Sequence, residues 1–327
     1  MKAIVRYQYG LPEQIRIVEL PKPVPKENEV LIRVKATTVN RTDCGVLSGA
    51  PYIFRFFVGW PKPKTPILGT DFGGVVEEIG EKVTRFKVGD RVWGFDDNGL
   101  PSQAEFMAYD ENKNILTIPE GFSFAEGAAA GEAAHYAVNF LNKVHPQKSS
   151  KILVNGATGG IGSALVQILK YRGHSVTATA NTKNLELISS LGVDRLIDYE
   201  KEDFTKLDEV FDFVLDAVGK STFRKCKPIL SERGVYLSSE LGDGIENLYL
   251  PLTTKLKGGK KVIFPLPSNI KKSMASIQEM MENGAFRAII ERDFPIEQAA
   301  EVYRYVASGQ KTGNVILDFG NLERKSG

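Results

Sequence analysis

A glycine-rich turn between an apolar run and an amphipathic stretch carries the clearest chemistry in this sequence. Lys151–Asn155 is predicted to be a strand and Ser163–Lys170 a helix, and the turn between them reads Ala157-x-Gly159-x-x-Gly162. Gly159 would let the backbone approach a phosphate, and Gly162 would let the helix pack on the strand. The helix start adds free N–H groups and the positive end of its dipole. Because a strand precedes the glycine turn and a helix follows it, the pattern predicts a dinucleotide site. The alternative is a glycine-rich turn without a ligand. The residues expected around the pyrophosphate are Thr158, Gly159, Gly160 and Ile161.

Strands and helices alternate on both sides of this turn. Such βαβ alternation predicts an α/β fold with a doubly wound parallel sheet. Helices are expected at Ser123–Leu141, where Ser123 and Glu126 are spaced as a capping box, and at Asn184–Leu191. The expected strands are Lys151–Asn155, Ser175–Ala180, Arg195–Tyr199, Phe211–Val218, Gly234–Ser239 and Lys261–Phe264.

The two ends of the chain have a different pattern. Short runs separated by proline and glycine turns predict a β-rich region up to about residue 122. Its expected strands are Lys2–Tyr7, Ile15–Glu19, Glu29–Thr38, Gly73–Ile79 and Arg91–Phe95. The tail is expected to form helices at Ile270–Asn283 and Ile296–Ser308 and a strand at Gly313–Phe319.

Length, charge and cysteine content narrow the class of protein. A chain of 327 residues fits two domains. Its net charge of +2 does not favour a nucleic-acid partner, and we expect no membrane span because no apolar run approaches the roughly 20 residues required. Two cysteines, Cys44 and Cys226, cannot build a disulfide framework, so a cytoplasmic location is expected.

Several motifs occur together in an informative order. They are Asn40-Arg-Thr-Asp43, Pro66–Val75, Phe86–Gly94, the glycine turn and Lys311–Leu317. Together they resemble the medium-chain dehydrogenase/reductase superfamily, and within it the zinc-independent quinone oxidoreductase-like branch. The resemblance implies a GroES-like catalytic domain at residues 1–122 and 268–327. It also implies a Rossmann NAD(P)-binding domain at residues 123–267, with the cofactor between the two domains.

The resemblance also bears on metal binding. Zinc-dependent relatives hold a catalytic zinc with a cysteine, a histidine and a third thiolate or carboxylate. Here those positions fall on Asn40, on Thr70 and near Gly131 or Glu132. Amide and hydroxyl groups are poor zinc ligands, and two cysteines cannot form a four-cysteine structural site. We therefore expect no metal, with Asn40 facing the reacting centre as a hydrogen-bond donor and Asp43 anchoring its loop.

The end of the second strand indicates which nicotinamide cofactor binds. NAD-selective sites usually place an acid there, but this chain reads Thr177-Ala-Thr-Ala-Asn-Thr-Lys-Asn184. Asn181 and Lys183 could hold a 2′-phosphate, which favours NADPH. The alternative is that Lys183 is a solvated lysine at a helix start. By resemblance, Tyr199 packs on the adenosine end, Val218 and Ser238 line the cofactor, and Asn314 closes on the nicotinamide side.

Two further groups are candidates for contact with substrate. Tyr52, Phe56 and Trp60 lie in a densely aromatic segment where a flat apolar substrate could stack. A packed loop or an interface is the alternative for this segment. His135 and Tyr136 stand where the family usually has an apolar residue and a threonine. Either could donate a proton, and a structural role for His135 is the alternative.

These features together predict an NADPH-dependent, zinc-independent oxidoreductase that reduces quinones or α,β-unsaturated carbonyls. A metal-free alcohol or aldehyde oxidoreductase and an NADPH-binding scaffold without turnover are the alternatives. The resemblance implies a homodimer, joined near Lys260–Phe264. The sequence does not identify the specific substrate or the proton donor.

Overall fold

The computed structural model describes residues 1–50, 52, 55–242, 245–266 and 269–320, without the side chain of Phe57. Its contacts divide the chain into two compact units. The first unit is Met1–Glu132, Ile270–Glu282 and Arg287–Gly327, and the second is Ala133–Asn269 and Asn283–Phe286. Among the described residues, no helix is long and apolar enough to cross a membrane.

The second unit is built on a six-stranded sheet with the order β10-β9-β8-β11-β12-β13. Every neighbouring pair in it is parallel. The chain starts in the middle of the sheet and reverses direction at β8, which is the doubly wound dinucleotide-binding order. The predicted parallel α/β fold is therefore confirmed. The strands are β8 (Ile152–Asn155), β9 (Val176–Ala180), β10 (Arg195–Asp198), β11 (Phe211–Asp216), β12 (Leu230–Ser238) and β13 (Lys261–Ile263).

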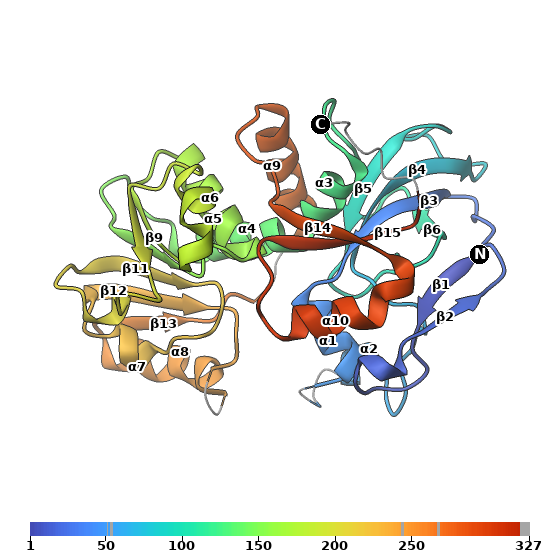
Figure 1. Ribbon diagram of the computed structural model, residues 1–327. Coiled ribbons are helices and arrows are strands. Elements are labelled where there is room, and N and C mark those ends of the chain that lie inside the picture. Colours follow the sequence, from blue (N-terminus) through green and yellow to red (C-terminus); the bar gives the residue numbers. More distant parts are fainter. Residues whose placement is uncertain (51, 53–54, 243–244, 267–268, 321–327) are drawn as a thin grey trace. The chain divides into compact units, whose positions relative to one another are not determined.

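Helices connect these parallel strands (Figure 1). The helix after the glycine turn, α5, is buried along most of its length, as expected of a crossover helix beside a sheet. The helices of this unit are α4 (Glu132–Val144), α5 (Gly160–Tyr171), α6 (Leu185–Ser189), α7 (Phe223–Cys226) and α8 (Glu246–Lys257), with short 3-10 turns at Thr182–Asn184 and Phe204–Lys206.

The first unit is the predicted β-rich region. Its seven-stranded sheet has the order β14-β15-β3-β4-β5-β7, with β6 also on β3, and β1 pairs separately with β2. Figure 1 shows the red strand β15 beside the blue strand β3, so the two ends of the chain share one sheet. The strands are β1 (Lys2–Val5), β2 (Arg16–Glu19), β3 (Glu29–Thr38), β4 (Asp71–Ile79), β5 (Arg91–Phe95), β6 (Phe106–Asp110), β7 (Ile115–Thr117), β14 (Ile290–Pro295) and β15 (Asn314–Asp318).

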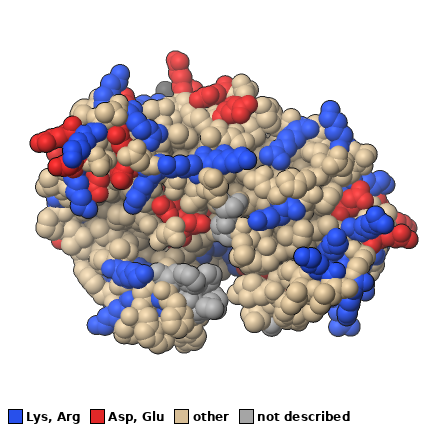
Figure 2. Space-filling view, turned by 180° about the vertical axis from the view of Figure 1, so that it is seen from behind, with Lys and Arg blue, Asp and Glu red and all other residues tan. Residues whose placement is uncertain are grey.

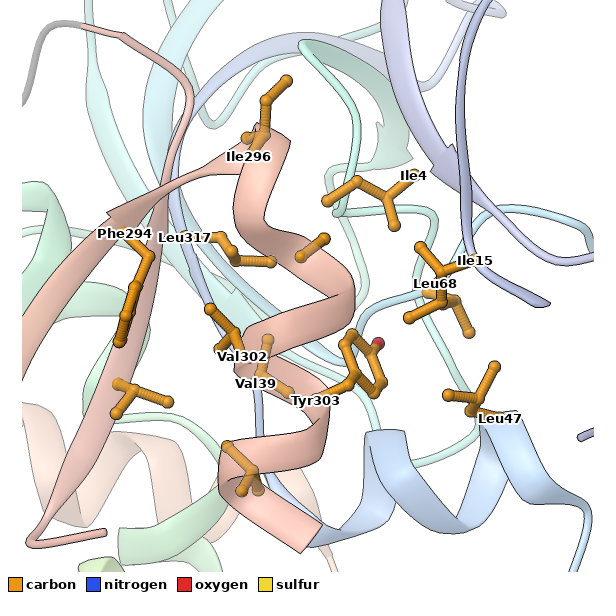
Figure 3. Close-up of a cluster of buried hydrophobic side chains, with 13 residues drawn as sticks. Ile4, Ile15, Val39, Leu47, Leu68, Phe294, Ile296, Val302, Tyr303 and Leu317 are labelled. Atoms are coloured by element: carbon orange, nitrogen blue, oxygen red, sulfur yellow. The ribbon is translucent and has the colours of Figure 1, made fainter. Parts of the chain in front are cut away.

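One hydrophobic core of this unit joins its N-terminal and C-terminal segments. Figure 3 shows Val302 and Tyr303 of α10 facing Ile4 of β1, Leu47 of α1 and Leu317 of β15. Burial of these apolar side chains holds the tail on the sheet. The helices of this unit are α1 (Arg41–Ser48), α2 (Arg55–Val58), α3 (Phe124–Ala129), α9 (Ile270–Glu282) and α10 (Ala299–Ala307), with 3-10 turns at Pro12–Gln14 and Ile296–Gln298.

The segment expected to form one helix, Ser123–Leu141, forms two. The predicted capping box of Ser123 and Glu126 begins α3, which ends at Ala129. Gly131 follows α3, and a glycine suits this position because a Cβ there would press on the side chains of Asp71 and Phe95. Since α3 packs on β3, β4 and β5, it lies in the first unit. The expected domain boundary near residue 122 therefore precedes the division of the structure, which falls after Glu132.

Candidate cofactor site and a buried polar cluster

The glycine turn has the geometry of a phosphate-binding turn. Gly156, with φ of 83°, makes the left-handed bend at the start of the turn. Gly162 packs so closely that a Cβ on it would collide with the Gly156 carbonyl oxygen, as predicted. A Cβ on Gly159 would meet only that same oxygen, at 3.6 Å, so the space beside Gly159 is open. The residues present therefore leave room for a pyrophosphate.

The start of α5 suits an anion. Gly159 is its N-cap and has no side chain to occupy the first N–H groups of the helix. Those groups and the helix dipole attract negative charge. A dinucleotide pyrophosphate fits this turn on both steric and electrostatic grounds.

Most of the predicted cofactor residues lie at one edge of the parallel sheet. Thr158–Ile161 follow β8, Asn181 follows β9, Tyr199 follows β10 and Val218 lies just past β11, while Ser238 ends β12. Because the carboxyl ends of parallel strands meet at one edge, these positions come together. Tyr199 is half-exposed, whereas Ser238 is buried and its Oγ accepts from the Glu240 N–H.

A cation and two acids meet at the turn after β9. Lys183 is exposed there. The Thr182 hydroxyl donates to Asp198 at 2.7 Å, and the Thr182 N–H donates to Glu200 at 2.9 Å. No acid lies at the end of β9 itself, but these two carboxylates reach the turn from the end of β10. Lys201 forms an ion pair with Asp198 at 3.2 Å.

Sequence reasoning missed a buried network behind this edge. Asp216, at the end of β11, accepts from Asn155 and from Tyr236, at 3.0 and 2.8 Å. Asn155 in turn accepts from the Thr179 hydroxyl at 2.8 Å. The available signal was a polar residue ending each of two apolar strands, Ile-Leu-Val-Asn155 and Phe-Asp-Phe-Val-Leu-Asp216.

In the first unit, Asn40 lies in a buried polar cluster. Its side-chain amide donates to Thr70 Oγ1 at 2.7 Å and to Thr38 Oγ1 at 3.3 Å. Its Oδ1 caps α1 by accepting from the Asp43 N–H, and the Asp43 carboxylate accepts from the Asn40 N–H. Both amide hydrogens of Asn40 are thus engaged, whereas we had expected one to face the substrate.

Three carboxylates lie in or beside this cluster, and burial raises the pKa of each. Burial raises the pKa of Asp71 to about 6, although Thr38 and Thr37 donate hydrogen bonds to its carboxylate. Burial also raises the pKa of Glu132 to about 7, against hydrogen bonds from Thr42. The pKa of Asp43 is raised by burial and by the charge of Asp71. Charge in this cluster is therefore costly, and each carboxylate depends on its donors.

His135 and Tyr136 lie on α4 in the second unit. His135 is fully buried, its Nε2 is 2.9 Å from Asn139 Nδ2, and burial lowers its pKa to about 4. A buried neutral imidazole does not suit the role of proton donor that we had allowed for it. Tyr136 is half-buried, with its ring edge-on to His135.

The expected substrate-facing aromatic residues are on the surface of the first unit. Tyr52 and Phe56 are each 71% exposed and Trp60 is 62% exposed. The rings of Phe56 and Trp60 stack at 5.7 Å, and the Arg55 guanidinium lies 4.5 Å from the Tyr52 ring centroid. Such rings suit a flat apolar group. Phe54 of the same segment lies outside the described residues.

Asn314 is buried at the start of β15 in the first unit. Its backbone N–H and its side-chain amide both donate to the Ile289 carbonyl, at 2.8 and 3.1 Å. Asn314 therefore connects β15 to the segment before β14.

Charge on the surface is mixed. Figure 2 shows acidic as well as basic side chains on one face, in keeping with a net charge of +2.

Within the described ranges, no group of three His, Cys, Asp or Glu residues has the arrangement of a metal site. The Asn40–Thr70 hydrogen bond joins the positions where the first two zinc ligands were sought. The Asn40 amide N–H that donates to the Thr70 hydroxyl has no lone pair to offer a metal. The residues present therefore do not fit a catalytic zinc.

Family models match most of the chain. The alcohol dehydrogenase GroES-like domain matches residues 26–146, and the zinc-binding dehydrogenase model matches residues 191–317. The model of the NAD-dependent epimerase/dehydratase family matches residues 152–222, which include the glycine turn.

Individual proteins are similar over nearly the whole length. A chloroplastic quinone oxidoreductase of Triphysaria versicolor is 31% identical, covering 93% of this chain and 94% of that protein. A chloroplastic NADPH-dependent alkenal/one oxidoreductase of Arabidopsis thaliana is 29% identical, covering 97% and 79%. The solved quinone oxidoreductase of Coxiella burnetii has a TM-score of 0.83 at 26% identity, covering 97% and 99%.

Proposed function

Since the chain belongs to the quinone oxidoreductase-like branch of the medium-chain dehydrogenase/reductase superfamily, we propose that it reduces quinones or α,β-unsaturated carbonyls with NADPH and without zinc. The observation that carries this proposal is the open, uncapped glycine turn at the carboxyl edge of the parallel sheet. When bound there, NADPH supplies a hydride. The names of the quinone and alkenal/one oxidoreductase relatives support the substrate class.

Zinc independence is proposed from the residues themselves. The Asn40 amide donates a hydrogen bond to the Thr70 hydroxyl, and the Glu132 carboxylate accepts hydrogen bonds from Thr42. Hydrogen-bond donors, in place of a metal ion, would therefore polarise the substrate carbonyl. Of the two Asn40 bonds, the 3.3 Å one to Thr38 is the longer, and a substrate carbonyl could replace it. We retain Asn40 as the proposed donor and Tyr136 as a second candidate.

The preference for NADPH over NADH rests on Lys183. An exposed ammonium at the end of β9 would attract a 2′-phosphate, and one relative is named NADPH-dependent. Asp198 and Glu200 oppose this preference, although Thr182 donates to both and Lys201 pairs with Asp198.

A homodimer is proposed at the β13 edge of the sheet. Beside it, α8 buries Asn247 and Thr254 and exposes Leu248, Leu252 and Leu256. An exposed leucine stripe on a helix is typical of an interface. Light scattering should find a dimer, and Leu252→Glu should dissociate it. The control Leu11→Glu, at an exposed leucine of the first unit, should not. A monomeric wild type would refute this proposal.

A cytoplasmic location is proposed because both cysteines are free thiols, which suits a reducing compartment. Two similar proteins are named chloroplastic, so fractionation of the source cells should compare cytosol with plastids where these exist.

The test of the function is a substrate panel. Purified protein should oxidise NADPH with a quinone or an enone, keep its rate in chelator, and contain no stoichiometric zinc. Activity confined to aldehydes would favour the alcohol/aldehyde alternative. NADPH binding without turnover of any substrate would favour the scaffold, and loss of activity in chelator would refute zinc independence.

A further inference from the structure

One carboxylate lies behind the glycine turn, and the mechanism above does not use it. Asp216 ends β11 and is completely buried. Its Oδ1 accepts from the Asn155 amide at 3.0 Å and from the backbone N–H groups of Gly219 at 3.0 Å and Val218 at 3.3 Å. Its Oδ2 accepts from the Tyr236 hydroxyl at 2.8 Å and from the Ser221 N–H at 3.3 Å. Every partner is a donor, so only a carboxylate satisfies them all.

The network continues from Asp216 to the glycine turn. The Asn155 amide oxygen accepts from the Thr179 hydroxyl at 2.8 Å. The Thr179 Oγ1 in turn accepts from the Gly156 N–H at 2.9 Å. Because Thr179 has a single hydroxyl hydrogen and gives it to Asn155, it can only accept from Gly156. The direction of each bond is thereby fixed.

Two segments at the ligand-binding edge thus depend on one side chain. Through Asn155 and Thr179, Asp216 holds Gly156, the left-handed residue that starts the turn. Directly, it holds the N–H groups of Val218 and Gly219 in the loop after β11. Gly219 is itself left-handed, with φ of 65°, so this loop has an uncommon shape that needs support.

We infer that Asp216 is a positioning residue for the cofactor, because it fixes the glycine turn and the Val218–Gly219 loop in relation to each other. This inference rests on the proposed function, since it assumes that a dinucleotide binds at this edge. It assigns Asn155 and Thr179 the role of connecting Asp216 to the turn.

The same strand provides a matched control at its opposite end. Asp212 lies near the start of β11, and its carboxylate accepts from the Lys151 N–H at 3.0 Å and the Ser231 hydroxyl at 2.9 Å. It thus connects β11 to the segment before β8 and to β12, as Asp216 does, but at the amino edge. Asp212→Asn should disturb the sheet and leave the ligand-binding edge unchanged.

The experiment titrates wild type, Asp216→Asn and Asp212→Asn with NADPH and measures urea unfolding of the same samples. An amide replaces one acceptor oxygen with a donor, so one set of donors around residue 216 loses its partner. Asp216→Asn should weaken NADPH binding by about tenfold, the equivalent of one hydrogen bond to a charged group. Asp212→Asn should change it by less than about twofold.

A kinetic readout separates positioning from simple stability. With an enone as acceptor, Asp216→Asn should raise the KM for NADPH and leave kcat at saturating NADPH nearly unchanged. A lower kcat with an unchanged KM would indicate loss of folded enzyme and overturn the inference. Equal NADPH affinities for Asp216→Asn and Asp212→Asn would also overturn it.

A second variant covers the case in which Asp216→Asn does not fold. Thr179→Val removes the hydroxyl that holds the Gly156 N–H and leaves Asp216 in place. Thr179→Val should also weaken NADPH binding. If this variant bound NADPH as tightly as the wild type, the inference would be overturned. If wild type itself binds neither NADPH nor NADH, the proposed function fails, whereas failure of the variants alone refutes only the role of Asp216.

Discussion

Each unit of the molecule contains a buried carboxylate held by neutral donors, and the two carboxylates, Asp71 and Asp216, lie in different settings. In the first unit, Asp71 starts β4 and accepts from Thr37 and Thr38 of β3, at 2.5 to 3.3 Å. In the second, Asp216 ends β11 and accepts from three segments at the ligand-binding edge. Burial raises the pKa of both. From these positions we expect Asp71 to act in the fold, and we infer that Asp216 acts at the cofactor.

Removal of Asp71 is expected to have the largest effect. Asp71→Ala leaves the Thr38 N–H and hydroxyl buried without an acceptor, which should lower the free energy of unfolding by about 3–5 kcal/mol. Urea unfolding measures this loss. NADPH affinity of the folded fraction should be unchanged, and a large loss of affinity would remove the distinction between Asp71 and Asp216.

The pH dependence of stability should have opposite signs in the two units. The pKa of Asp71 is raised from 3.8 to about 6, so its folded form binds the proton more tightly and its contribution to stability falls as pH rises through that range. The pKa of His135 is lowered from 6.5 to about 4, so its contribution rises with pH over that range. Each is on the order of 3 kcal/mol.

Two variants separate these contributions. Between pH 4 and 6, Asp71→Asn should make stability rise more steeply with pH than in wild type, and His135→Gln should make it rise less steeply. Urea unfolding at a series of pH values measures both slopes. Unchanged slopes would mean that these groups titrate normally.

The cofactor preference tests the exposed edge of the second unit. Lys183→Ala should weaken NADPH binding by about 1–3 kcal/mol and leave NADH binding nearly unchanged. Lys206→Ala is the control, because Lys206 is an exposed lysine of the same unit that pairs with Asp203, away from the turn after β9. An equal loss of affinity for NADPH and NADH would show that Lys183 does not recognise the 2′-phosphate.

The smallest effect is expected at a partly exposed carboxylate of the first unit, Glu77. Glu77 pairs with Arg33 through two bonds of 2.6 and 2.7 Å, and these bonds lower the pKa of Glu77. Solvent screening should keep the cost of Glu77→Gln below about 1 kcal/mol in urea unfolding. A cost equal to that of Asp71→Ala would show that burial is not the deciding difference.

Much of the fold could be predicted because periodicity and turn residues report on it directly. The glycine turn located β8 and α5, and the strand–helix alternation gave the parallel sheet. The chain end near Gly313–Phe319 was predicted as a strand, but its pairing with β3 depends on contacts between distant residues. Strands β6, β7 and β14 were missed, since they are short or carry charged residues without clear alternation.

The candidate site was less predictable, because hydrogen-bond partners are not visible in local sequence. Asn40 was singled out as the donor facing the reacting centre, but its hydrogen bonds to Thr70, just before β4, and to Thr38, at the end of β3, arise only in the fold. Asp216 and Thr179 lie far apart in sequence and are connected through Asn155. Glycine positions could be read from spacing, whereas polar networks could not.

Single-turnover oxidation of bound NADPH by an enone tests the central claim most directly. Protein freed of metal by chelator and loaded with NADPH should convert the enone to the saturated carbonyl in an amount equal to the NADPH oxidised. Asn40→Ala should slow this step by about 3 kcal/mol in activation free energy and retain NADPH affinity. Bound NADPH that remains unoxidised with every enone and quinone would contradict the account.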